Sequence, residues 1–134
     1  MSVADAQKEP VVRVFRLVSD QYPIEVVSRD TIMNSWLLEQ TEDAVRDILQ
    51  LLDLEQEPFS ELTLRWRPGN ADGVLSFPRS LILENQQLQL EIDLTGAKRS
   101  QVVSIRRTLV IALLQSYIWQ GHSSLRQDII PDPP

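Results

Sequence analysis

The chain contains no cysteine among its 134 residues, and it has only one histidine and four glycines. Without cysteine, disulfide scaffolds, thiolate zinc sites and cysteine nucleophiles are all excluded. With His122 as the single imidazole, a metal site would need carboxylates alone, and no Gly-x-Ser-x-Gly motif is present for a catalytic triad. We therefore expect no catalytic residues, no metal site and no cofactor, and the protein is predicted not to be an enzyme.

Long apolar runs are also lacking. The longest uninterrupted one, residues 109–114, is far shorter than the roughly 20 residues that span a bilayer, and residues 1–10 have no signal-peptide core. Together with the absence of cysteine, this pattern predicts a cytoplasmic protein that does not enter a membrane.

Positive charge is scarce as well, because 13 basic residues face 19 acidic ones and leave a net charge of −6. Nucleic acids and anionic membranes repel such a molecule, so neither is an expected partner. The charges are segregated along the chain. Residues 39–61 hold eight carboxylates and one arginine, whereas residues 98–107 hold four cations and no acid.

What the chain does contain is enough apolar sequence for one domain. An apolar fraction of 43% with 24% charged residues is typical of globular proteins of this length. We predict a mobile leader over residues 1–9, a single α+β domain over 10–125 and a proline-containing tail over 126–134.

The first half of the chain predicts two strands and two helices. Residues 11–18 and 24–27 are rich in β-branched residues and suggest a hairpin. A short helix follows over residues 30–37, capped by Asp30 or Thr31. Thr41 then caps a second helix that runs to about Leu54, where Pro58 prevents continuation.

The second half predicts three strands and a long helix. Strict alternation marks strands at residues 62–67 and 88–94, and residues 74–84 read as a strand interrupted by Pro78. Turns are expected at residues 68–73 and 84–87, so that the three strands form a meander. Residues 98–121 form the helix, with Gly121 as its C-cap and His122 just beyond it.

The resulting fold class is α+β, an antiparallel sheet of about five strands in the order β-β-α-α-β-β-β-α with a long C-terminal helix packed on it. This order of elements, though no motif, is similar to that of PAS-like and roadblock-like sensory or adaptor domains. The resemblance implies a small-molecule-binding sensory domain, or an enzyme with an unrecognised site, as the alternative to an interaction protein.

The long helix has apolar residues on too many faces for a helix that covers one side of a core. One stripe is expected to lie on the sheet, and it comprises Val102, Ile105, Leu109, Ala112, Leu113 and Ser116. A second stripe lies roughly 150° away and comprises Val103, Arg107, Ile111, Leu114 and Ile118. It is exposed unless the helix near residues 41–54, or a second subunit, covers it.

Lys98 and Arg99 stand at the start of this helix, where cations are locally unfavourable. A nucleotide site is not indicated, because the spacing of a P-loop is missing. We expect these cations to pair with the acidic segment 39–61, within one chain or between chains. A weak oxyanion-binding site formed by Lys98 and Arg99 is the alternative.

Arg65 and Arg67 fall on the polar face of their strand, where Arg79 of the neighbouring strand could join them. We interpret this face as solvated. Trp66 falls on the opposite face, and Trp36, Trp66 and Trp119 are interpreted as core or interface anchors.

These patterns favour a non-enzymatic protein–protein interaction module, such as an adaptor, an assembly factor or a small acidic chaperone-like protein. Its partner is another protein, with a homodimer as one form; a small-molecule ligand is not expected. The predicted partner-binding residues are Lys98, Arg99, Arg107, Ile111, Leu114 and Ile118.

Overall fold

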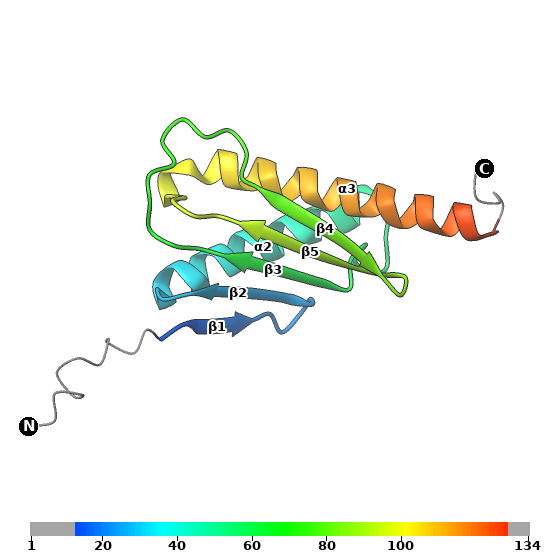
Figure 1. The fold of residues 1–134 in the computed structure, drawn as a ribbon, viewed down its shortest axis with the longest axis horizontal. Helices are drawn as coiled ribbons and strands as arrows, with labels where there is room; N and C mark the ends of the chain where they lie inside the picture. The colour runs from blue at the N-terminus through cyan, green and yellow to red at the C-terminus, as the bar shows by residue number, and fades with distance from the viewer. Residues whose placement is uncertain (1–12, 129–134) are drawn as a thin grey trace, which may run out of the picture.

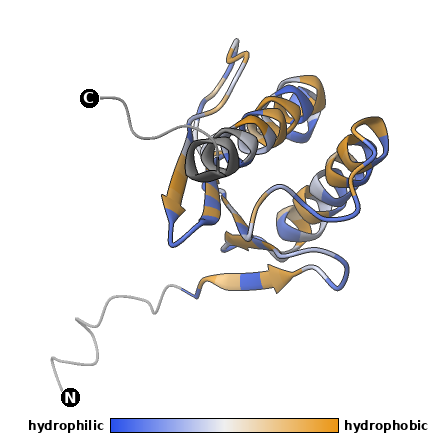
Figure 2. Ribbon diagram, turned by 90° about the vertical axis from the view of Figure 1, so that its right-hand side faces the viewer, coloured by the Kyte–Doolittle hydropathy of each residue, from blue (hydrophilic) through white to orange (hydrophobic). Residues whose placement is uncertain are grey.

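The computed structural model describes the backbone of residues 13–128 and the side chains of residues 13–121. Two long helices lie on one face of a single five-stranded sheet, and no helix among the described residues covers the other face (Figures 1 and 2). The elements are β1 (Phe15–Val18), β2 (Ile24–Ser28), α2 (Thr31–Leu51), β3 (Glu61–Arg65), β4 (Arg79–Glu84), β5 (Gln87–Asp93), the 3₁₀ turn η1 (Arg99–Gln101) and α3 (Val102–Asp128).

The sheet is mixed, so the predicted antiparallel sheet is wrong. Its order is β1-β2-β3-β5-β4, in which β2–β3 and β3–β5 are parallel and only the outer pairs β1–β2 and β4–β5 are antiparallel. The physical reason is that α2 forms a crossover between β2 and β3, which keeps both strands in the same direction. The predicted meander fails as well, because β4 occupies the outer edge and β5 returns between β4 and β3.

The two helices predicted in the first half are one helix, so the predicted order of elements is also wrong. Thr41 is not a cap. It is fully buried in the middle of α2, and its hydroxyl donates a hydrogen bond to the carbonyl of Leu37 at 2.7 Å. Because the helical spacing of buried residues passes through this position without a break, nothing ends the helix here. The buried residues are Met33, Asn34, Leu37, Leu38, Thr41, Ala44, Val45 and Ile48.

The ends of α2 have recognisable caps. The carboxylate of Asp30 accepts hydrogen bonds from the backbone N–H groups of Ile32 and Met33, both at 3.0 Å, which confirms one of the two predicted caps. At the other end the N–H of Leu54 donates to the carbonyl of Leu49, with Asp53 in a left-handed conformation. This Schellman closure ends the helix at Leu51, before Pro58 is reached.

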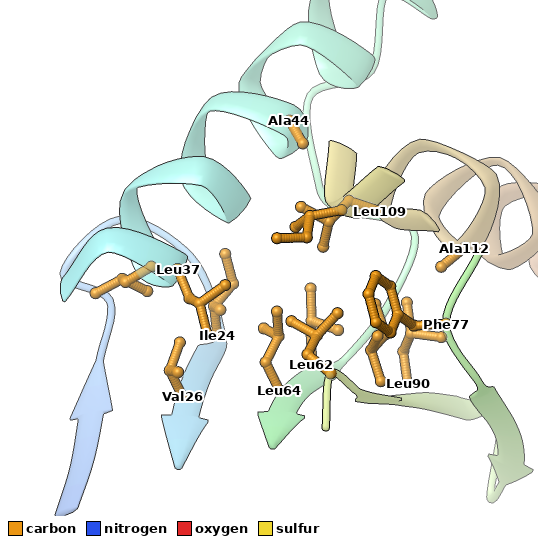
Figure 3. Packing of buried hydrophobic residues seen from close by; sticks show 14 of the residues in the cluster. Ile24, Val26, Leu37, Ala44, Leu62, Leu64, Phe77, Leu90, Leu109 and Ala112 are labelled. Atoms are coloured by element: carbon orange, nitrogen blue, oxygen red, sulfur yellow. The ribbon is translucent and has the colours of Figure 1, made fainter. Parts of the chain in front are cut away.

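One hydrophobic core lies between the sheet and the two helices. The predicted alternation in β3 and β5 is confirmed, because Leu62, Leu64, Leu90 and Ile92 are buried while the residues between them face the open side or solvent. In Figure 3, Leu37 and Ala44 of α2 and Leu109 and Ala112 of α3 lie over these strands.

A long connection, residues 66–78, crosses from β3 to the outer edge and is tied down along its length. The indole of Trp66 donates to the carbonyl of Ala97 at 2.8 Å, and the amide of Gln101 donates to the carbonyl of Ala71 at 2.6 Å. Gly96 has φ +81°, and a Cβ there would lie 3.1 Å from the Cβ of Ala71. The connection therefore packs against the start of α3, and β4 begins only after Pro78, at Arg79.

The long helix does not end at Gly121, which corrects the predicted C-cap. Its backbone continues to Asp128 and so includes His122. Gly121 has no positive φ, and no proline follows until Pro131, so neither usual signal for termination acts here. The predicted leader over 1–9 lies outside the described residues, as do residues 129–134 of the tail.

A substitution at Gly121 tests this continuation. Because Gly121 is in a helix and an added Cβ would meet nothing within 4 Å, Gly121→Ala should stabilise the last turns by about 1 kcal/mol. The measurement is slower amide exchange around residue 121 and a stronger helical circular dichroism signal. Gly96→Ala, at a positive φ and in close contact, is the control that should destabilise the fold. Lower helicity in Gly121→Ala would instead support the predicted C-cap at Gly121.

The hairpin between β4 and β5 carries two non-glycine residues in the left-handed region, Asn85 (φ 52°) and Gln86 (φ 64°). Such a turn normally has glycine at its second central position. We therefore predict that Gln86→Gly raises the free energy of unfolding by about 1 kcal/mol in urea denaturation. Gln87→Gly, the same change inside β5, should lower it; equal losses in both variants would contradict the turn assignment.

Candidate functional site: the outer face of α3

The sheet-facing stripe of α3 is where the sequence places it. Ile105, Leu109, Ala112 and Leu113 are buried in the core, Ser116 is buried with its hydroxyl bonded to the carbonyl of Leu113, and Val102 is half-buried. This side of the helix is therefore structural.

The second stripe is only partly covered. Leu114 is half-buried and packs against the core, and Ile111 is half-buried. Arg107 is exposed, and Ile118 is 59% exposed. The fold thus covers the middle of the stripe from one side and leaves both of its ends in solvent, with Val103 68% exposed at the N-terminal end.

Further apolar side chains extend this surface, and sequence periodicity alone does not single them out as exposed. Tyr117 and Trp119, which flank Ile118, are 42% and 54% exposed, although they point in different directions around the helix. Figure 1 shows that the C-terminal end of α3 projects beyond the end of the sheet. Trp119 thus differs from Trp36 and Trp66, which are both partly buried against the core.

The structure does not bring all six predicted partner-binding residues together in one chain. Lys98 and Arg99 precede α3, and a helical rise of about 1.5 Å per residue separates Arg99 from Ile118 by roughly 28 Å. Lys98 forms an ion pair with Asp72 at 2.7 Å, and its backbone N–H donates to the side chain of Gln101 at 3.0 Å. Arg99 is exposed.

Pairing between the acidic and basic segments exists within the chain, but through a different cation than expected. The guanidinium of Arg106 lies 3.2 Å from Asp47 and 3.8 Å from Asp43, and it donates to the backbone carbonyl of Gln40 at 3.1 Å. These contacts join α3 to α2. Lys98 uses an acid of the 66–78 connection instead, which lies outside the acidic segment.

The open face of the sheet carries a second cluster of charges. Arg65 pairs with Glu91 at 2.9 Å and Arg16 with Glu25 at 3.3 Å, as expected for a solvated face. Arg79 does not join them. It lies on the helix-covered face and donates to the side chain of Gln115 of α3 at 2.7 Å.

The fold adds little support for a metal site or for a membrane-spanning helix. Among the described residues, no group of three or more histidine, aspartate or glutamate side chains is placed to hold a metal ion. Residues Arg99–Gly121 are long and apolar enough to cross a membrane by length and composition alone. A core helix passes the same test, and Ile105, Leu109 and Leu113 are core residues.

No known protein family, curated protein or solved structure matches this chain. The function of the outer face of α3 therefore has to be inferred from the side chains that it carries. It offers apolar and aromatic surface with one guanidinium, Arg107, and no carboxylate between residues 99 and 121. Such a surface suits protein contact and provides no acid–base pair for catalysis.

One group on the open face has a shifted pKa. The hydroxyl of Thr95 lowers the pKa of Asp93 below its ordinary value of 3.8, against an opposing effect of partial burial, and the Thr95 N–H, Arg67 and Arg65 add to the lowering. The Thr95 N–H donates to this carboxylate at 3.0 Å. Ionised Asp93 therefore holds the end of β5 to the start of the following turn.

Because the folded-state pKa is depressed, ionised Asp93 stabilises the fold above its unfolded-state pKa, and this contribution is lost as pH falls through the lower, folded value. We predict that wild type and Asp93→Asn differ by a constant free energy of unfolding above about pH 5, and that the difference shrinks as the pH falls below it. Urea denaturation across this range checks it. In Thr95→Val the Asp93 carboxyl should titrate closer to 3.8; an unchanged titration would contradict the assigned cause.

Proposed function

We propose that the chain is a non-enzymatic protein–protein interaction module, of the adaptor, assembly-factor or small chaperone-like kind, and that its working surface is the outer face of α3. The observation that supports it is the exposure of Val103 and Ile118, at 68% and 59%, at the two ends of the stripe on the outer side of α3. We also propose a cytoplasmic location, since the chain has no cysteine.

The exposed side chains give up the free energy that their burial would contribute to the stability of the fold. Burying an isoleucine or leucine side chain contributes roughly 1.5 to 3 kcal/mol, which is a large part of the net stability of a domain. Single exposed apolar residues are ordinary, but grouped aromatic and aliphatic side chains mark interaction surfaces. Tryptophan and tyrosine are also the residues that most often anchor interfaces.

We further propose a second copy of this chain as the occupant, because the last four residues of the stripe are symmetrically spaced. Arg107, Ile111, Leu114 and Ile118 are separated by four, three and four residues. The spacing reads the same in both directions. In an antiparallel pair related by a two-fold axis, Ile111 would face Leu114 of the second copy, and Arg107 would face Ile118.

Charge favours the antiparallel arrangement over the parallel one. A parallel pair would set Arg107 against Arg107 of the second copy, with no acid in residues 99–121 to separate them. In the antiparallel pair Arg107 faces Ile118 of the second copy instead, so this repulsion between like charges is absent. Of the six predicted partner-binding residues, Arg107, Ile111, Leu114 and Ile118 would then share one interface.

Sedimentation tests this proposal. Wild type should sediment with twice the 15.4 kDa mass of the chain, and Ile111→Asp/Ile118→Asp should sediment as a folded monomer, because a desolvated carboxylate is costly in an apolar seam. Ile32→Asp is the matched control, since Ile32 is 64% exposed on α2, and it should remain a dimer. A wild type that is monomeric at about 100 μM would contradict the self-pairing.

The orientation can be tested separately because the chain has no cysteine of its own. With a short bifunctional thiol reagent, Arg107→Cys/Ile118→Cys should give a covalent dimer, whereas Arg107→Cys alone should not. Efficient cross-linking of Arg107→Cys alone would indicate a parallel pair and contradict the antiparallel arrangement.

A further inference from the structure

A hollow of about 340 Å³ opens on the uncovered face of the sheet, far from the outer face of α3. It lies where β2, β3 and β5 end, and these three strands are parallel. Ligands in open sheets with parallel strands bind outside the carboxyl ends of the strands, which is this position. Five charged side chains line it: Arg29, Arg65, Arg67, Glu91 and Asp93.

The strand register explains why these residues meet. Val27 is paired with Arg65, and Arg65 with Asp93, so the three form one row across the sheet. Alternation puts them on the face opposite the helices. Arg29 and Arg67 each follow two residues later in the chain and continue the same face beyond the strand ends. The sequence predicts Arg65 and Arg67 on one face but cannot reveal Arg29 beside them.

The two acids in the hollow are already engaged. Glu91 accepts a hydrogen bond from the Nε of Arg65 at 2.9 Å, and Asp93 accepts from the N–H of Thr95 at 3.0 Å. By contrast, neither Arg29 nor Arg67 has a carboxylate within 4 Å among the residues that the structure describes. Two guanidinium groups at one edge of a hollow are therefore available to an incoming anion.

The wall beside the arginines is apolar. Val27 is only 6% exposed although it lies on the open face, and Val14 lines the hollow from the segment that precedes β1. A ligand that reaches Arg29 and Arg67 would thus place its neighbouring atoms against valine side chains.

We infer that this hollow binds a small organic monocarboxylate with a short aliphatic body. Guanidinium groups hold carboxylates through paired, charge-assisted hydrogen bonds. Three arginines against two carboxylates leave the lining one positive charge, which a single carboxylate balances. A phosphate dianion exceeds that charge and meets repulsion from Glu91 and Asp93. The volume, near the lower end for ligand pockets, also selects a small molecule.

Isovalerate is the probe, with neutral isovaleramide and inorganic phosphate as comparisons, followed by amide chemical shifts in the full chain. Isovalerate should shift the amides of Val27, Arg29 and Arg67 saturably, with a dissociation constant of about 1 mM. Arg29→Gln and Arg67→Gln should each weaken binding about tenfold, because each removes one charge-assisted contact. Arg99→Gln, an exposed arginine elsewhere, should leave it unchanged.

The inference fails if isovalerate gives no saturable shifts, if isovaleramide or phosphate binds as tightly, or if Arg29→Gln and Arg67→Gln bind like Arg99→Gln. A short peptide ending in leucine, with a free or an amidated C-terminus, distinguishes the source of the carboxylate. Tighter binding of the free peptide than of isovalerate supports the site and assigns it to a chain end. None of these outcomes depends on whether α3 forms a dimer.

Discussion

Both helices pack on the same face of one sheet, and the rest of the structure depends on this one-sided burial. The central strands β3 and β5 direct Leu62, Leu64, Leu90 and Ile92 toward the helices. Among the residues that the structure describes, no further layer lies above the helices (Figure 2). A helix in such a two-layer fold needs one apolar face. Because α3 has apolar residues on its outer side as well, the described residues leave part of this apolar surface uncovered.

The position of α3 is set on three of its sides. Ile105 and Leu109 pack on the sheet, Arg106 contacts Asp47 of α2, and Gln115 accepts from Arg79 of β4. Thr108 adds a buried contact, since its hydroxyl accepts from the N–H of Phe77 at 2.9 Å. These contacts fix the rotation of the helix about its axis. They consequently determine that Arg107 and Ile118 face outward.

Local patterns in the sequence predict the elements better than their arrangement. Alternation marks β3 and β5, and the stripe from Ile105 to Leu113 is assigned to the sheet, because both patterns depend only on the period of the backbone. The parallel pairing of β2, β3 and β5 depends on contacts between distant segments, for which no local signal exists. The predictions that Thr41 and Gly121 are helix caps are wrong for a related reason. A residue type that caps helices is also tolerated inside a helix when its neighbours continue the helical pattern.

The residues of the candidate sites also separate into those that a local pattern predicts and those that depend on contacts between distant segments. Ile111, Leu114 and Ile118 follow from helical spacing, but the exposure of Trp119 depends on which elements pack around the end of α3. The partner of Arg106 and the meeting of Arg29 with Arg67 both require the crossover topology. Residues whose role depends on register across parallel strands are thus the ones that sequence reasoning misses.

The central claim, that the outer face of α3 is covered by a second copy, can be tested at single methyl groups. Isoleucine methyl spectra recorded with a soluble paramagnetic agent compare Ile118 directly with buried Ile105 and with exposed Ile32 in the same sample. The account predicts that the Ile118 methyl is shielded from the agent nearly as well as that of Ile105. Attenuation of Ile118 equal to that of Ile32 would contradict it.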